Sequence, residues 1–206
     1  IIIFFKMSRP YINDIMEIFR SKIKGQKYNW PKTKNKGKVG ILLENLLGIP
    51  NSSACLDCED GELKSFQLKK LICKSKFGNK GDYVPKETVA ITMIKTSDLQ
   101  TTSFENSRLN KKIKRICFIP YIRHDDDIIF IDCYLFDHSN SLQDEILSDY
   151  IDIQKYYNEN KITKGKIGKL IQIRTKGAGG EAPKSHAFYF RKDCLAKICD
   201  PIKILA

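Results

Sequence analysis

The chain has 206 residues, of which 42% are hydrophobic, and its formal net charge is +12 at pH 7. That hydrophobic fraction is enough for a packed core and excludes a chain that is disordered along its whole length. The positive charge and the interspersed aromatic residues favour a polyanionic partner, with nucleic acid first, although a lysine-rich composition alone gives the same charge.

The predicted elements, taken in chain order, alternate between helices and strands. Apolar side chains at helical spacing predict a helix over residues 8–23, and a short apolar helix over 37–48 follows a polar, basic loop at 25–38. The later expected elements are strands over 87–94, 115–122, 128–136, 168–176 and 186–191, an amphipathic helix over 142–160 and a final helix over 192–199. This order predicts an α/β (α+β) fold with a mixed central sheet flanked by helices.

Neither the cysteines nor the first residues indicate secretion. Seven scattered cysteines, an odd number, argue for reduced thiols in a cytoplasmic protein. The opening IIIFFKM is too short for a membrane span and lacks the charged start of a signal peptide. Met7 is a candidate natural start, which would make residues 1–6 an upstream read-through. With no linker in view, we expect a single domain over residues 1–206.

The stretch CLDCEDGELKSF, residues 55–66, allows two interpretations. Cys55 and Cys58 have the C-x-x-C spacing of a zinc half-site or a redox motif, but the chain has no second C-x-x-C. Asp60-Gly61 predicts a two-residue hairpin turn, which points the two cysteines to opposite faces. That geometry is poor for holding one zinc ion or closing a disulfide.

The same hairpin would place four charged residues on one face: Asp57, Glu59, Glu62 and Lys64. Three neighbouring carboxylates repel one another unless a cation lies between them, and Mg²⁺ prefers such oxygen ligands. A nearby lysine can orient the attacking water or neutralise charge on a phosphate. The pattern therefore points to metal-assisted phosphodiester hydrolysis, although an exposed charged hairpin gives the same spacing.

Six segments then follow one another in a fixed order between residues 36 and 199. They are KGKVGILLENLLG (36–48), DCEDGELKS (57–65), VPKETVAITMI (84–94), KIKRICFIP (112–120), GKLIQIRTKGAGGEA (168–182) and AFYFRKD (187–193). Together they resemble the MutH-type endonucleases, which include the mismatch-repair nickase MutH and restriction endonucleases that cut at GATC. The resemblance implies a PD-(D/E)xK restriction-endonuclease-like fold whose two lobes form a DNA cleft.

The resemblance also implies catalytic roles. Asp57, Glu62 and Lys64 correspond to the catalytic triad, with Asp57 and Glu62 as the metal ligands. Glu44 corresponds to an auxiliary acid, and Lys114 to a basic residue near the scissile phosphate. Four residues separate Asp57 from Glu62, fewer than is usual in the family, so the spacing itself is an open question. Asp60 is the rival metal ligand, although we expect it in the turn.

The DNA-binding residues that the resemblance and the chemistry indicate are Lys36, Gly37, Glu87, Arg174, Thr175, Lys176 and Tyr189. An arginine such as Arg174 can pair in bidentate fashion with guanine O6 and N7. Lys176 would contact a base or a phosphate. The glycines at 177, 179 and 180 would let the backbone approach DNA closely.

Together these expectations predict a Mg²⁺-dependent type II site-specific deoxyribonuclease that cuts double-stranded DNA at GATC-like sites. Mn²⁺ is the expected substitute ion. Cutting both strands would require a second active site, which makes a homodimer on DNA the expected assembly. Two alternatives stay open: a MutH-like nickase of hemimethylated GATC with a MutL-type partner, and a DNA-binding module without catalysis.

Overall fold

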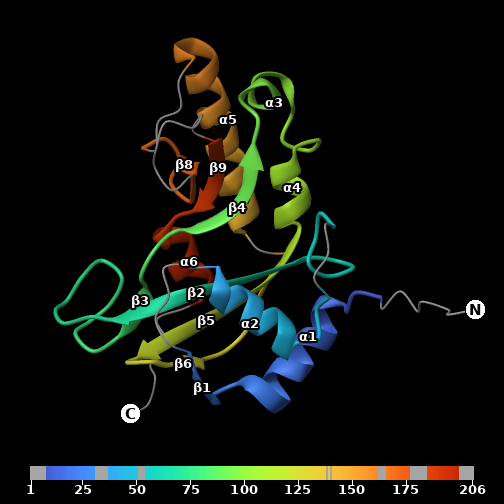
Figure 1. The fold of residues 1–206 in the computed structure, drawn as a ribbon. Coiled ribbons are helices and arrows are strands. Elements are labelled where there is room, and N and C mark those ends of the chain that lie inside the picture. The colour runs from blue at the N-terminus through green and yellow to red at the C-terminus, as the bar shows by residue number, and fades with distance from the viewer. Residues whose placement is uncertain are drawn as a thin grey trace, which may run out of the picture. The chain divides into compact units, whose positions relative to one another are not determined.

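The computed structural model describes residues 8–30, 37–50, 54–137, 139, 141–161, 166–176 and 185–199 (Figure 1). The chain forms two compact units. Unit 1 comprises Ile1–Gln67 and Arg115–Leu135, and unit 2 comprises Leu68–Lys114 and Phe136–Ala206.

Unit 1 contains a mixed sheet with strand order β1-β6-β5-β2, and β7 also pairs with β5. Its strands are β1 (Lys27–Asn29), β2 (Glu62–Lys70), β5 (Arg115–His124), β6 (Asp127–Phe130) and β7 (Tyr134–Asp137). Residues 68–70 of β2 and 136–137 of β7 already belong to unit 2. β2 and β5 run parallel, whereas β5–β6 and β1–β6 are antiparallel. The predicted mixed sheet is therefore confirmed. The single strand expected over 128–136 is wrong, because it is interrupted at residues 131–133 and forms β6 and β7.

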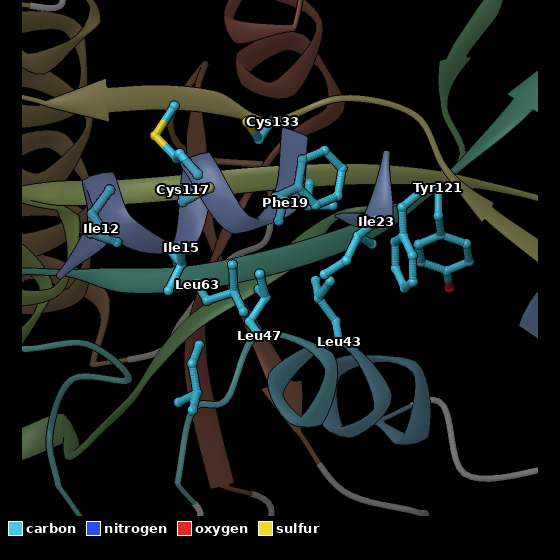
Figure 2. Close-up of a cluster of buried hydrophobic side chains, with 14 of the residues drawn as sticks. Ile12, Ile15, Phe19, Ile23, Leu43, Leu47, Leu63, Cys117, Tyr121 and Cys133 are labelled. Atoms are coloured by element: carbon cyan, nitrogen blue, oxygen red, sulfur yellow. The ribbon is translucent and has the colours of Figure 1, made fainter. Parts of the chain in front are cut away.

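The core of unit 1 lies between this sheet and two helical segments (Figure 2). The first combines α1 (Ile12–Ile18) with the π-helical turn η1 (Phe19–Ile23), and the second is α2 (Lys38–Leu46). The five apolar residues at helical spacing are all buried: Ile12, Ile15, Met16, Phe19 and Ile23. They pack with Val39 and Leu43 of α2 and with side chains from one face of the sheet. We call this set the core cluster.

Alternation along β2 and β5 decides which side chains enter the core cluster. Leu63 of β2 and Cys117, Ile119 and Tyr121 of β5 belong to it. The parallel register pairs Glu62 with Ile116 and Lys64 with Phe118, so these residues lie on the opposite face of the two strands. At its start, β2 therefore carries the packing residue Leu63 on one face and the ionisable Glu62 and Lys64 on the other, and further along that second face is buried at Phe66 and Leu68.

Unit 2 is built on a three-stranded antiparallel sheet of order β4-β9-β8. Its elements are β3 (Tyr83–Pro85), β4 (Val89–Ile94), α3 (Thr96–Thr101), α4 (Arg108–Ile113), α5 (Leu142–Asn160), β8 (Ile171–Lys176), β9 (Ser185–Phe190) and α6 (Lys192–Ile198). β3 pairs with the last three residues of β2. Sequence patterns predicted α5 and the strands of the sheet, but not β1, β3, α3 or α4, which are too short to show a period.

A buried carboxylate fixes the start of β8. Asp149 of α5 accepts the backbone N–H groups of Lys169, Leu170 and Ile171 at 2.7, 2.6 and 2.9 Å. Its side chain is nearly fully buried. These three bonds join α5 to the strand that carries Arg174. Within the part of the chain that the structure describes, none of the helices is both long and apolar enough to cross a membrane.

Candidate active site

The start of β2 brings together the three residues of the expected triad. Lys64 Nζ lies 3.5 Å from Glu62 Oε1 and 3.7 Å from Asp57 Oδ2. The Glu62 side chain is 0% exposed, whereas those of Lys64 and Asp57 are 19% and 31% exposed. One lysine thus lies against two carboxylates at a site that is buried at one end and open to solvent at the other.

The short connection from Asp57 to Glu62 is a bent loop, and the predicted hairpin is wrong. Residues 55–60 form no strand, and the partner of β2 at this end is β5. The loop closes on itself, because Cys58 donates its N–H to the Gly61 carbonyl at 2.9 Å. Leu63, the second residue of β2, donates its N–H to Asp57 Oδ2 at 3.0 Å. This bond holds the Asp57 carboxylate next to the start of the strand. The four-residue spacing therefore keeps Asp57 beside Lys64.

Contacts with α1 and β5 explain why the Asp-Gly pair does not form a hairpin turn. Asp60 accepts the N–H of Ile12 at 2.8 Å and pairs with Arg115. A Cβ added to Gly61 would lie 2.5 Å from the Arg115 carbonyl oxygen, so glycine is needed for close approach rather than for an unusual backbone angle. Asp60 is engaged in fixing the beginning of α1, which weakens it as the rival metal ligand.

The fourth member of the predicted charged face, Glu59, lies apart from the triad. Glu59 pairs with Arg9 at 3.3 Å and does not join the triad, which corrects the expectation of four charged residues on one face.

Cys58 lies fully buried in the core cluster. Burial and then the charge of Asp57 raise the pKa of its thiol to about 12. A thiol in that state is a poor zinc ligand and a poor nucleophile. Cys55 is half-buried.

Glu44 lies close enough to the triad to interact with it electrostatically. Its position on α2 directly follows the buried Leu43. Burial raises the pKa of the Glu44 carboxyl, the charge of Asp57 raises it further, and Lys64 opposes both effects. The expected auxiliary acid is therefore a half-buried carboxyl whose charge state responds to the other members of the site.

The donor set suits a hard divalent cation that keeps much of its own hydration. Among the residues that the structure describes, no group of three or more His, Cys, Asp or Glu side chains is arranged to hold a metal. Two carboxylates, those of Asp57 and Glu62, flank Lys64. Mg²⁺ is commonly bound by one or two carboxylates together with water and substrate phosphates, so this arrangement fits it better than Zn²⁺ or Ca²⁺.

The sheet of unit 2 brings together two of the expected DNA-binding residues. Arg174 on β8 is exposed, donates to Thr88 Oγ1 at 2.9 Å, and lies 5.6 Å from the ring centroid of Tyr189 on β9. Thr175 is exposed beside it on β8. Glu87 is exposed one residue before Thr88. Arginine stacked on an aromatic ring keeps its planar hydrogen-bonding edge free for a partner.

The remaining expected residues are placed less fully. Gly37 is the exposed N-cap of α2, and Lys114 is the exposed C-cap of α4 in unit 2. Lys36, the side chain of Lys176, and the glycines at 177, 179 and 180 lie outside the described residues. Sequence reasoning did not identify Arg115 or Asp149. No motif marks either residue, because each acts on a segment distant in the sequence.

The site lies inside a stretch that matches a known family. The model of the family described as "MutH: DNA mismatch repair enzyme MutH" matches residues 49–139. The chain resembles the MutH family. The matched stretch includes Asp57, Glu62 and Lys64, as well as Glu87 and Lys114, whereas Glu44 and Arg174 lie outside it.

Solved structures and curated sequences were also compared with the chain. One solved structure, described as "Restriction endonuclease MvaI-cognate DNA substrate complex", is 16% identical, with 90% of this chain and 93% of that chain covered and a TM-score of 0.41. A search of curated proteins gives no match.

Proposed function

We propose that the protein is a metal-dependent, site-specific DNA endonuclease that hydrolyses phosphodiester bonds. The observation that carries the proposal is the cluster of Asp57, Glu62 and Lys64 at the start of β2, inside the segment that matches the MutH family model. A buried carboxylate, a second carboxylate and a lysine within 4 Å of both are the residue types that the resemblance implies for the catalytic triad of a PD-(D/E)xK nuclease.

Asp57 and Glu62 would hold the divalent cation, Mg²⁺ or in its place Mn²⁺. When bound, that ion supplies a Lewis acid for the phosphate and an acidified water. Lys64 presents its ammonium group between the two carboxylates, where it orients the attacking water or neutralises charge that develops on the phosphate. The products carry 5′-phosphate ends, as the family resemblance implies.

Glu44 would act as an auxiliary acid beside the cation. Burial and then the charge of Asp57 raise the pKa of its carboxyl, and a bound cation would oppose the effect of Asp57 and so favour the charged form. We expect the Glu44 carboxylate to accept a hydrogen bond from water at the site. Lys114 would contact the phosphate backbone.

Sequence readout is assigned to unit 2. Arg174 is exposed, and its orientation is restricted by the hydrogen bond to Thr88 and by the Tyr189 ring. A guanidinium group held in this way suits bidentate pairing with guanine. Thr175 and Lys176 follow it along β8, and Glu87 precedes Thr88. Lys36 and Gly37 would contact the backbone. A GATC-like site and a type II restriction enzyme are the specific form of the proposal.

The test compares the wild-type protein with Lys64→Ala, and with Lys155→Ala as a matched control on the exposed face of α5. Each is incubated with Mg²⁺ and with plasmids methylated or unmethylated at GATC adenines. Lys64→Ala should lower the cutting rate by about 10²–10⁴-fold. Its affinity for DNA, measured by fluorescence anisotropy, should stay near that of the control.

The cleavage products distinguish the forms of the proposal. Discrete fragments from unmethylated plasmid identify a restriction endonuclease, and their ends give the site. Nicked circles alone favour the repair-type enzyme. Intact plasmid with retained DNA binding, or a Lys64→Ala variant that cuts as fast as the control, would refute the catalytic assignment.

A further inference from the structure

A second feature of the chain, separate from the active site and from the expected readout residues, is the segment that joins β2 to β3. Residues 69–86, which we call the lysine hairpin, contain six lysines and a single acid, Asp82. All six lysines are exposed: Lys69, Lys70, Lys74, Lys76, Lys80 and Lys86. A surface of one sign over so short a segment raises the local potential and attracts counter-ions.

The lysine hairpin is an ordered structure rather than a loose loop (Figure 1, between β2 and β3). Lys69 and Lys70 pair with Val84 and Tyr83 across the two strands. Leu71 and Val84 are 8% and 2% exposed and anchor its base. Beyond them, Leu71 donates its N–H to the Asp82 carbonyl at 2.9 Å, and a tight turn closes between Ser75 and Gly78. Leu71 and Val84 therefore point inward, whereas the lysines and Ile72, which is 86% exposed, project into solvent.

The structure already assigns partners to some of the charges. Asp82, the single acid, accepts the backbone N–H of Asn79 at 2.7 Å, so it stabilises the turn. Lys76 pairs with Asp193 at 2.5 Å and lies 4.7 Å from the ring centroid of Phe77. Lys70 lies over the ring of Tyr83 at 6.0 Å.

Lys86 is also engaged within the chain, which leaves three lysines with neither an ion pair nor a ring contact among the described residues. Lys69, Lys74 and Lys80 are exposed and have no ion pair in the described part of the chain. They are distributed along an ordered backbone, so a ligand that contacts all three must itself be extended and carry repeated negative charge. Phosphates of duplex DNA recur every few ångströms and meet that requirement, whereas a single small anion does not.

We propose that the lysine hairpin is a phosphate clamp that grips duplex DNA through Lys69, Lys74 and Lys80, independently of base sequence. The inference rests on the proposed function, because under that proposal duplex DNA is the substrate and therefore the polyanion that the hairpin would meet. The hairpin adds affinity and salt sensitivity, and takes no part in the bond cleavage or in reading the site.

The chain carries its own reporter for this surface. Cys73, exposed and next to Lys74, is a thiol within the lysine hairpin, whereas the half-buried Cys55 lies two residues from Asp57 in the active-site loop. Maleimide labelling of the two thiols, resolved by peptide mass, therefore reports separately on the hairpin and on the active site. Ca²⁺ replaces Mg²⁺ so that DNA stays intact.

Two charge-matched triple variants complete the experiment. In the first, glutamine replaces Lys69, Lys74 and Lys80; in the second, it replaces three exposed lysines elsewhere, Lys22, Lys155 and Lys166. The hairpin variant should bind DNA about tenfold or more weakly at low salt. The slope of log affinity against log salt should fall by roughly 0.9 for each lost contact. The control variant should keep the wild-type slope, and wild-type Cys73 should react severalfold more slowly with DNA present.

Each other result has a definite meaning. DNA that protects Cys55 but not Cys73, or equal salt slopes for the two variants, overturns the clamp and leaves the proposed function intact. A wild-type protein that does not bind DNA overturns both. Protection of Cys73 by phosphatidylserine vesicles, but not by DNA, overturns the clamp in favour of a membrane surface.

Discussion

Replacing Gly61 with alanine tests how the short loop is held against the sheet of unit 1. The added Cβ would lie 2.5 Å from the Arg115 carbonyl oxygen and 2.9 Å from Ile12 Cγ1. The first neighbour is backbone of β5, which is fixed by its parallel pairing with β2 and cannot rotate away. Either the loop or the start of β5 must therefore move.

The expected magnitude follows from two opposing effects. Overpacking costs ~1–3 kcal/mol, with this site near the upper end because the clash is with backbone. Alanine also restricts the unfolded chain, which offsets ~0.4–1 kcal/mol of that loss. Gly61→Ala should therefore lower the free energy of unfolding by ~1–2 kcal/mol. Cutting should fall as well, since Gly61 directly precedes Glu62.

Urea unfolding followed by tryptophan fluorescence measures this effect directly. Trp30 is the one tryptophan of the chain and packs against the core cluster, so its emission reports on unit 1. Gly40→Ala is the matched control in α2, where the nearest atom to the added Cβ is Ser65 Oγ at 4.0 Å. Alanine is the better helix former there by up to ~1 kcal/mol, so this control should be at least as stable as the wild type.

A Gly61→Ala protein as stable as Gly40→Ala would refute the reasoning. It would show that Gly61 is a tolerant loop position and that close approach to β5 does not set the position of Glu62.

Two further predictions concern buried or half-buried carboxyls. Burial and then the charge of Asp57 raise the folded-state pKa of Glu44, so its contribution to stability is full below the unfolded pKa and is lost as pH rises through the folded pKa. Over that rise in pH, Glu44→Gln should lose less unfolding free energy than wild type in urea titrations, and parallel curves would contradict this. Asp149→Ala leaves three N–H groups, two of them buried, without their carboxylate and should cost ~3 kcal/mol or more. Amide exchange at Leu170 and Ile171 should accelerate first, whereas unchanged protection there would show that the carboxylate does not fix β8.

The grouping of Glu62 and Lys64 could be predicted because it depends only on strand alternation. Residues two apart on a strand share a face whatever their neighbours do. The hairpin before them could not be predicted, because the Asp-Gly rule is local and the contacts that override it are not. Asp60 is held by the N–H of Ile12 and by Arg115, which are 48 and 55 residues away in the chain.

Unit 2 shows the same contrast between features that a local sequence pattern predicts and features that depend on distant contacts. The amphipathic pattern over 142–160 predicted the full extent of α5, since nineteen residues give several helical turns to read. The approach of Arg174, Tyr189 and Thr88 depends on the strand order β4-β9-β8, which no local pattern encodes. Short elements such as β1 and β3 are fixed by their sheet partners rather than by their own side chains.

The two faces of β2 have a consequence for how such a protein can change over generations. A slip of one residue in the pairing of β2 with β5 would turn Lys64 into the core cluster and Leu63 out of it, so stable folding itself selects the register that assembles the site. Substitutions on the core face threaten the fold and the chemistry together. Under the proposed function, a substitution of Asp57 or Lys64 would remove the chemistry and disturb only the start of β2, so a descendant that lost them would keep its lysine hairpin and the sheet that carries Arg174.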